Sequence, residues 1–158
     1  MARQNCQPNA ALFEAAAVDF IMDPSVIIAQ RIMFLIKTPL LMTFLDALSR
    51  QSEAWCEALL RRIHERVDQQ AVESWSIHVD SGRTPALMEA IAQGEAISLQ
   101  TLCLHPHDRA QRLPVLPLLL ERKGGVILLP EDDEILQAGD AVLFCGLDWV
   151  QGQMAWTV

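Results

Sequence analysis

The sequence predicts an α+β fold, with helices in the first half of the chain and a small β-rich lobe in the second. Three observations lead to this prediction. Two helix-opening signals, Asp23-Pro24 and Thr38-Pro39, each precede a long apolar segment. From about residue 71, apolar and polar residues alternate as they do along a half-buried strand. Glycine-containing turns then separate short apolar runs, which is typical of strands joined by tight turns.

Composition limits the possible functions. Of the 158 residues, 51% are hydrophobic, which is enough to form a core, and the formal net charge is −8. This charge argues against sequence-independent binding to nucleic acid or anionic membrane, because no Lys/Arg block exists to neutralise phosphates. The one arginine cluster, Arg61, Arg62 and Arg66, is interleaved with Glu57 and Glu65. Four cysteines without C-x-x-C spacing or a secretory signal predict reduced thiols in a cytosolic protein.

Helices dominate the first 70 residues. Asn9 or the preceding Gln7-Pro8 pair opens a predicted helix that ends near residue 18, and residues 19–22 follow as a short strand candidate. Residues 25–36 are apolar at nearly every position, which predicts a helix buried on more than one side. The apolar stretch 26–48 is interrupted by Arg31, Lys37, Pro39 and Asp46, so we do not expect it to span a membrane.

Two further helices are expected before the β-rich lobe. Thr38-Pro39 opens the first of them, LLMTFLDALS. The second covers residues 52–70, and its apolar residues share one face at i, i+4 spacing. Those residues are Trp55, Leu59, Ile63 and Val67.

The second half reads as a series of short strands. Alternation around Trp75 predicts the first strand, and Thr84-Pro85 opens a short helix that Gly94 ends. Residues 96–104 are expected to form a strand, residues 126–129 and 141–144 two more, and residues 147–158 an edge strand. Gly124-Gly125 is expected to supply the two-residue hairpin turn, and Gly139-Asp140 a second tight turn.

The last two strands and their loop follow the pattern P-x-x-D-x-x-L-x-x-G-D-x-V-L-F-x-G. This pattern resembles the TrkA-C domain, the C-terminal lobe of RCK (regulator of K⁺ conductance) proteins, over roughly residues 73–146. The matching residues are Pro130, Asp133, Leu136, Gly139, Asp140, Val142, Leu143, Phe144 and Gly146.

The beginning of the chain is similar to the end of the Rossmann lobe that precedes TrkA-C in RCK proteins. The resemblance implies three parts: the end of a Rossmann-like lobe (1–24), crossover and dimerisation helices (25–70) and a TrkA-C-like lobe (71–158). It also makes Arg3 and Asn5 candidate ligand-binding residues. The matching residues are Ala2, Arg3, Asn5, Asn9, Leu12, Phe13, Val18, Asp19, Ile21 and Pro24.

A dinucleotide site is not expected. Such a site needs a glycine-rich turn after its first strand, and the seven glycines of this chain form none. The chain is therefore expected to be a fragment that starts inside the Rossmann lobe, or a degenerate relative, with no nucleotide cofactor of its own.

In RCK proteins the crossover helices exchange between subunits, so the resemblance implies a homodimer or larger ring. The alternative is that these helices are buried within one chain. The residues expected at the dimer interface are Ile27, Ile28, Ile32, Phe34, Leu35, Leu41, Phe44 and Leu45.

Two segments could bind metal, and each has a simpler interpretation. His105-Pro106-His107-Asp108 contains common ligand types but suits a turn equally well. The acidic run 131–134 could bind Ca²⁺ but lacks alternating spacing, and a solvated loop is the simpler interpretation. We expect no metal site. The sequence also contains no G-x-S-x-G, H-E-x-x-H or phosphate-binding loop motif, so an enzyme is not expected.

The resemblance to RCK proteins implies a cytosolic regulatory module of a potassium channel or potassium-uptake system, which senses a ligand and acts on a membrane-embedded pore in the same or a partner chain. The alternative is a sensory or dimerisation domain of another transporter, with no ligand of its own.

Overall fold

The computed structural model describes residues 2–3, 21–22, 38–67 and 70–155 of the chain. It confirms an α+β fold, with helices packed around an antiparallel sheet. The chain divides into two compact units, Met1–Lys37 and Thr38–Val158. The second unit therefore includes the two helices that the sequence analysis had assigned to a separate segment, 25–70.

In the first unit, strands β1 (Ala2–Arg3) and β2 (Ile21–Met22) pair in parallel, with Ala2 opposite Ile21. The strand predicted at residues 19–22 is thus described over its last two positions. The helices predicted near residues 9–18 and 25–36 lie outside the described residues. Outside them too are the candidate ligand residue Asn5 and five candidate interface residues, Ile27, Ile28, Ile32, Phe34 and Leu35.

A four-stranded antiparallel sheet forms the centre of the second unit, in the order β3-β8-β6-β7. Its strands are β3 (Glu73–His78), β6 (Val115–Arg122), β7 (Gly125–Leu128) and β8 (Ala141–Gly146). All of β8 and the first six residues of β6 are buried. Such continuous apolar runs are typical of strands that are covered on both faces, which explains why β6 and β8 occupy the middle of the sheet.

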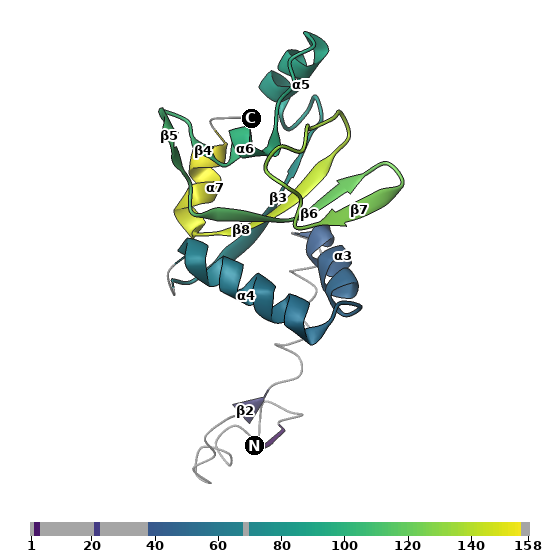
Figure 1. Cartoon of the computed structure of the whole chain (residues 1–158), viewed down its shortest axis with the longest axis vertical. Coiled ribbons are helices and arrows are strands. Elements are labelled where there is room, and N and C mark those ends of the chain that lie inside the picture. The colour runs from purple at the N-terminus through teal and green to yellow at the C-terminus, as the bar shows by residue number, and fades with distance from the viewer. Residues whose placement is uncertain (1, 4–20, 23–37, 68–69, 156–158) are drawn as a thin grey trace, which may run out of the picture. The chain divides into compact units, whose positions relative to one another are not determined.

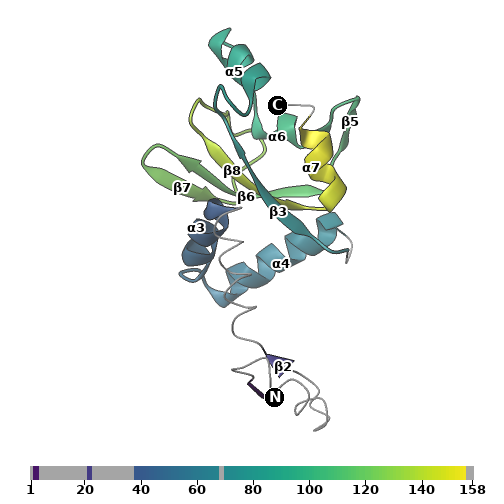
Figure 2. The same cartoon turned by 180° about the vertical axis from the view of Figure 1, so that it is seen from behind.

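Helices cover both faces of this sheet (Figures 1 and 2). On one face lie α3 (Pro39–Leu48) and α4 (Glu53–Val67), and Leu40, Phe44 and Leu59 pack there against Leu119 and Leu143. On the other face lie α5 (Pro85–Ala92), α6 (Leu99–Leu102), α7 (Asp148–Met154) and the small hairpin of β4 (Leu104–His105) and β5 (Asp108–Arg112).

Both helices on the first face begin and pack as the sequence predicts. Pro39 occupies the first turn of α3. Along α4, Leu59 and Val67 are buried and Trp55 and Ile63 pack against the core, so the predicted apolar face is confirmed.

The strand predicted at residues 96–104 is wrong. Leu99–Leu102 form the helix α6, because Leu99 and Leu102, three residues apart, are both fully buried against the core. An i, i+3 spacing places both side chains on one face of a helix but on opposite faces of a strand. Strand-like pairing in the segment is limited to an isolated bridge between Ser98 and Ile135 and to β4 at its end.

The edge strand predicted at residues 147–158 is also wrong within the described residues. Asp148–Met154 form α7, because Val150 and Met154 are four residues apart and both reach the core. A third, smaller correction concerns the hairpin turn between β6 and β7. Arg122 pairs with Gly125, so the two loop residues are Lys123 and Gly124 rather than Gly124 and Gly125.

Candidate functional site

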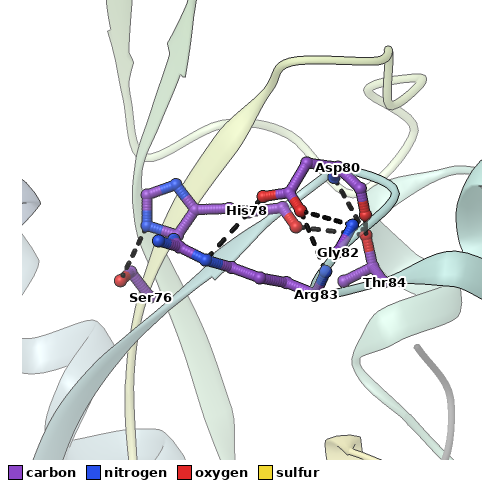
Figure 3. A network of polar contacts seen from close by, with 6 residues as sticks. All are labelled: Ser76, His78, Asp80, Gly82, Arg83 and Thr84. Atoms are coloured by element: carbon purple, nitrogen blue, oxygen red, sulfur yellow. Dashed lines mark hydrogen bonds and ion pairs between the residues drawn. The ribbon is translucent and has the colours of Figure 1, made fainter.

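The loop that follows β3 is held rigidly by its own polar side chains (Figure 3). The Asp80 carboxylate accepts hydrogen bonds from the backbone N–H groups of Gly82 and Arg83, each at 2.9 Å. The hydroxyl of Thr84 is buried, accepts the N–H of Asp80 at 3.1 Å and lies 3.1 Å from the carbonyl oxygens of His78 and Asp80. Short side chains that bond nearby backbone in this way fix a tight turn. The backbone that carries the Arg83 side chain is therefore held in one conformation by these hydrogen bonds.

A pocket of about 160 Å³ lies between this loop, the outer edge of β3 and the end of α7. In Figure 3 the side chain of Arg83 extends back toward the imidazole of His78. We call this cavity the edge-strand pocket. Its lining residues are Trp75, Ser76, Ile77, His78, Arg83, Thr84, Gln151 and Ala155.

The surroundings of His78 lower its pKa and so favour the neutral imidazole. Burial lowers the pKa of His78, and the nearby Arg83 guanidinium lowers it further, against the opposing effects of Asp80 and Glu121. The hydroxyl oxygen of Ser76 lies 3.3 Å from Nε2 of His78. Within the described part of the chain no carboxylate hydrogen-bonds to the other ring nitrogen, so the third member of a catalytic triad is not present there.

Trp75 lines this pocket with its ring, but its indole N–H is buried and does not open into the pocket. Its Nε1 is buried and has no hydrogen-bond partner among the described residues, while its ring stacks on Phe144 with centroids 6.2 Å apart. Buried polar groups nearly always have a partner, so this unpaired N–H is an exception within the core. The groups that the edge-strand pocket offers to a ligand are its apolar lining, the imidazole of His78 and the guanidinium of Arg83.

Two residues of the TrkA-C-like pattern, Gly139 and Asp140, form backbone hydrogen bonds with Val79, which directly precedes the pocket loop. The backbone N–H of Val79 donates to the carbonyl oxygen of Asp140, and the N–H of Gly139 donates to the carbonyl oxygen of Val79, both at 2.8 Å. Gly139 has φ +90°, a left-handed conformation that favours glycine. The pattern therefore joins the start of β8 to the loop that carries Arg83.

Asp140 itself has a structural role. Its carboxylate is buried and accepts hydrogen bonds from Arg122 and from the backbone N–H of Gln137. Of the other candidate positions, Gly146 closes β8 against the backbone of Pro114, Pro130 is buried after β7, and Asp133 is exposed.

Sequence reasoning missed the residue that binds this turn together. Arg122, at the end of β6, donates to Asp140, to the carboxylate of Glu134 at 2.7 Å and to the carbonyl oxygen of Ile135 at 2.8 Å. These carboxylates raise the pKa of Arg122. The available signal was a single arginine that ends an apolar strand shortly before an acidic run.

The two candidate metal segments have other contacts. In the acidic run 131–134, Asp132 pairs with Arg112 and Glu134 pairs with Arg122. His105 and His107 flank the turn between β4 and β5, with ring centroids 6.0 Å apart. Among the residues that the structure describes, no group of three His, Cys, Asp or Glu side chains is placed to hold a metal ion.

Of the candidate interface residues, the structure describes only the three on α3. Phe44 is 5% exposed and packs against its own sheet, which corrects its assignment to a dimer interface. Leu41 is half-buried against the same cluster, whereas Leu45 is 45% exposed. The apolar residues of α3 cannot all face a second subunit, because some of them cover the sheet of their own chain. The candidate ligand residue Arg3 lies in β1, away from the second unit in sequence.

Comparison with known proteins adds no assignment, since no protein-family model and no curated protein matches this chain. Among the described residues, no helix has both the length and the apolar character needed to cross a membrane.

Proposed function

We propose that this chain is a regulatory, ligand-sensing module on the cytoplasmic side of a potassium channel or potassium-uptake system, without enzymatic activity. The observation that carries the proposal is the resemblance of the segment from Pro130 to Gly146 to TrkA-C lobes. The connection of that segment to a pocket supports it, because Val79 links the turn at Gly139-Asp140 to the loop of Arg83.

The linkage suggests how a ligand would act. A small anionic or polar ligand in the edge-strand pocket contacts Arg83 and His78, which both line it. Movement of the Arg83 loop is transmitted through Val79 to Asp140 and then to Arg122. A ligand that prefers one arrangement of this loop shifts the population toward it, and the difference in affinity sets the size of the shift. In a dimer or ring, this shift would act on the attached pore.

The ligand-binding part of the proposal is tested by thermal unfolding with K⁺, Na⁺, Ca²⁺, ATP, ADP, NADH and cyclic di-AMP. A ligand present at about 100 times its Kd adds roughly 2.7 kcal/mol to the free energy of unfolding. We expect at least one compound to raise the melting temperature and Arg83→Gln to abolish that rise. Arg50→Gln, which removes another exposed arginine just after α3, is the matched control, because the side chains of Arg50 and Arg83 are 74% and 64% exposed.

The potassium part needs a flux measurement. In the organism that encodes the chain, ⁸⁶Rb⁺ flux is compared between the unmodified gene, Arg83→Gln and a deletion of residues 38–158. We expect the deletion to change the flux and Arg83→Gln to remove its response to the identified ligand. Unchanged flux in the deletion strain would exclude a role in potassium transport, whatever the pocket binds.

A further inference from the structure

Another, smaller cavity lies between α4, the start of β6 and the loop after β7. It has a volume of about 60 Å³, and its walls are mostly charged. Figures 1 and 2 both show the C-terminal end of α4 beside the start of β6. Its lining residues are Arg62, Arg66, Arg112, Leu116, Pro117, Pro130, Glu131 and Asp132.

Three arginines from two elements line this cavity. Arg62 and Arg66 are four residues apart on α4, so they lie on one side of the helix, and Arg112 ends β5. In the sequence, both helix arginines lie between the buried positions Leu59 and Val67, which fix the rotation of α4 against the core. The packing of α4 therefore places both arginines at the wall of the cavity.

The carboxylates of the cavity leave part of this positive charge uncompensated. Asp132 receives two hydrogen bonds from Arg112, and Glu131 is exposed. Within residues 38–67 and 70–155, neither Arg62 nor Arg66 forms an ion pair. Three arginines against two carboxylates give the cavity a net charge of about +1, in a chain whose net charge is −8.

One of the lining arginines also has a buried donor without a partner. The two terminal nitrogens of Arg112 donate hydrogen bonds to the Asp132 carboxylate, whereas its Nε has no hydrogen-bond partner among the described residues. The arginines also act on Asp132 at a distance. Arg112 lowers the pKa of the Asp132 carboxyl, with smaller contributions in the same direction from Arg66 and Arg62.

We propose that the cavity bounded by Arg62, Arg66 and Arg112 is a binding site for the phosphoryl group of a soluble phosphate compound. Guanidinium groups bind tetrahedral oxyanions through paired, charge-assisted hydrogen bonds. A volume of about 60 Å³ admits one such group, and the remainder of the compound stays outside. The site is separate from the edge-strand pocket and does not depend on a role in potassium transport.

The test uses inorganic phosphate and pyrophosphate as probes in isothermal titration calorimetry, at constant ionic strength set with chloride. We expect binding with a Kd at or below about 1 mM. Arg62→Gln and Arg66→Gln are each expected to weaken binding roughly ten- to a hundredfold, because a charge-assisted hydrogen bond is lost. Circular dichroism melts establish that both variants are folded.

Arg61→Gln is the matched control. Arg61 lies next to Arg62 on the same helix and carries the same charge, but it does not line the cavity. We expect it to bind both probes as the unmodified chain does. Equal weakening by Arg61→Gln would show that the anions respond only to overall charge, and an absence of binding by folded protein would overturn the site. Neither result bears on Arg83 or on ⁸⁶Rb⁺ flux.

Discussion

Arg122 holds the buried carboxylate of Asp140 with two hydrogen bonds, one from Nε at 3.0 Å and one from a terminal nitrogen at 2.8 Å. The Asp140 side chain is 1% exposed and that of Arg122 is 25% exposed. The pair joins the end of β6 to the start of β8, the two central strands of the sheet. This pair therefore fixes the turn at Gly139-Asp140, to which Val79 and the loop of the edge-strand pocket are hydrogen-bonded.

We predict that Arg122→Met destabilises the protein by about 3 kcal/mol, because it leaves the Asp140 carboxylate buried without its partner. The free energy of unfolding is measured by urea titration. Arg50→Met is the control, since Arg50 and Asp46 are 74% and 67% exposed and such a pair contributes roughly 0.5 kcal/mol. Similar losses in the two variants would contradict the structural role of Arg122.

Two glycine substitutions are predicted to act in opposite directions. A Cβ on Gly146 would lie 2.8 Å from the carbonyl oxygen of Pro114 and 3.0 Å from the indole of Trp75, so Gly146→Ala should cost roughly 1–3 kcal/mol. Gly152 lies inside α7 with open space around it, so Gly152→Ala should stabilise by about 1 kcal/mol. Urea unfolding of both variants checks the signs. Destabilisation by Gly152→Ala would contradict the helical, unobstructed position of Gly152 in α7.

The lowered pKa of His78 predicts a pH dependence. The unfolded chain binds a proton at His78 below about pH 6.5, whereas the folded chain resists it. The stability associated with neutral His78 is therefore full above that pH and is lost as the pH falls below it. We expect the unmodified protein to lose more stability than His78→Gln between about pH 7 and 5. Parallel curves for the two proteins would contradict this.

The neighbours of His78 make this prediction more specific. Arg83→Gln should raise the pKa of His78, because it removes a positive charge, and Glu121→Gln should lower it, because it removes a negative one. An NMR titration of the imidazole resonances measures both. An unchanged pKa in both variants would show that burial alone sets it, which would contradict the two charge contributions.

The expected dimer can be tested at the described part of its interface. Leu45 on α3 is 45% exposed and belongs to the expected interface, whereas Leu60 on α4 is 65% exposed and does not. We predict that Leu45→Glu lowers the dimer fraction in sedimentation equilibrium and that Leu60→Glu leaves it unchanged. A monomeric unmodified chain would exclude this homodimer. Loss of the dimer in both variants would show that the interface is not limited to α3 and includes the Leu60 side of α4.

The site combines features that sequence could and could not predict. The glycine at position 139 and the Thr84-Pro85 signal placed two of its turns correctly, because a left-handed residue and a helix start are local requirements. Arg122, Arg83 and Arg112 gave no comparable signal, and the arginine cluster of α4 gave no sign that Arg62 and Arg66 line a cavity. Their partners lie on other elements, and the pairing depends on which strands become neighbours.

The sequence by itself determined the α+β class, the helices α3 and α4, and the strands β3, β7 and β8, because their apolar periodicity and turn residues depend on local backbone geometry. Only the tertiary structure decided the state of residues 96–104 and 147–155. These short segments fit a strand or a helix equally well alone, and the core selects the helix because it buries Leu99 with Leu102 and Val150 with Met154. The same packing sets which charges meet, and therefore where both cavities lie.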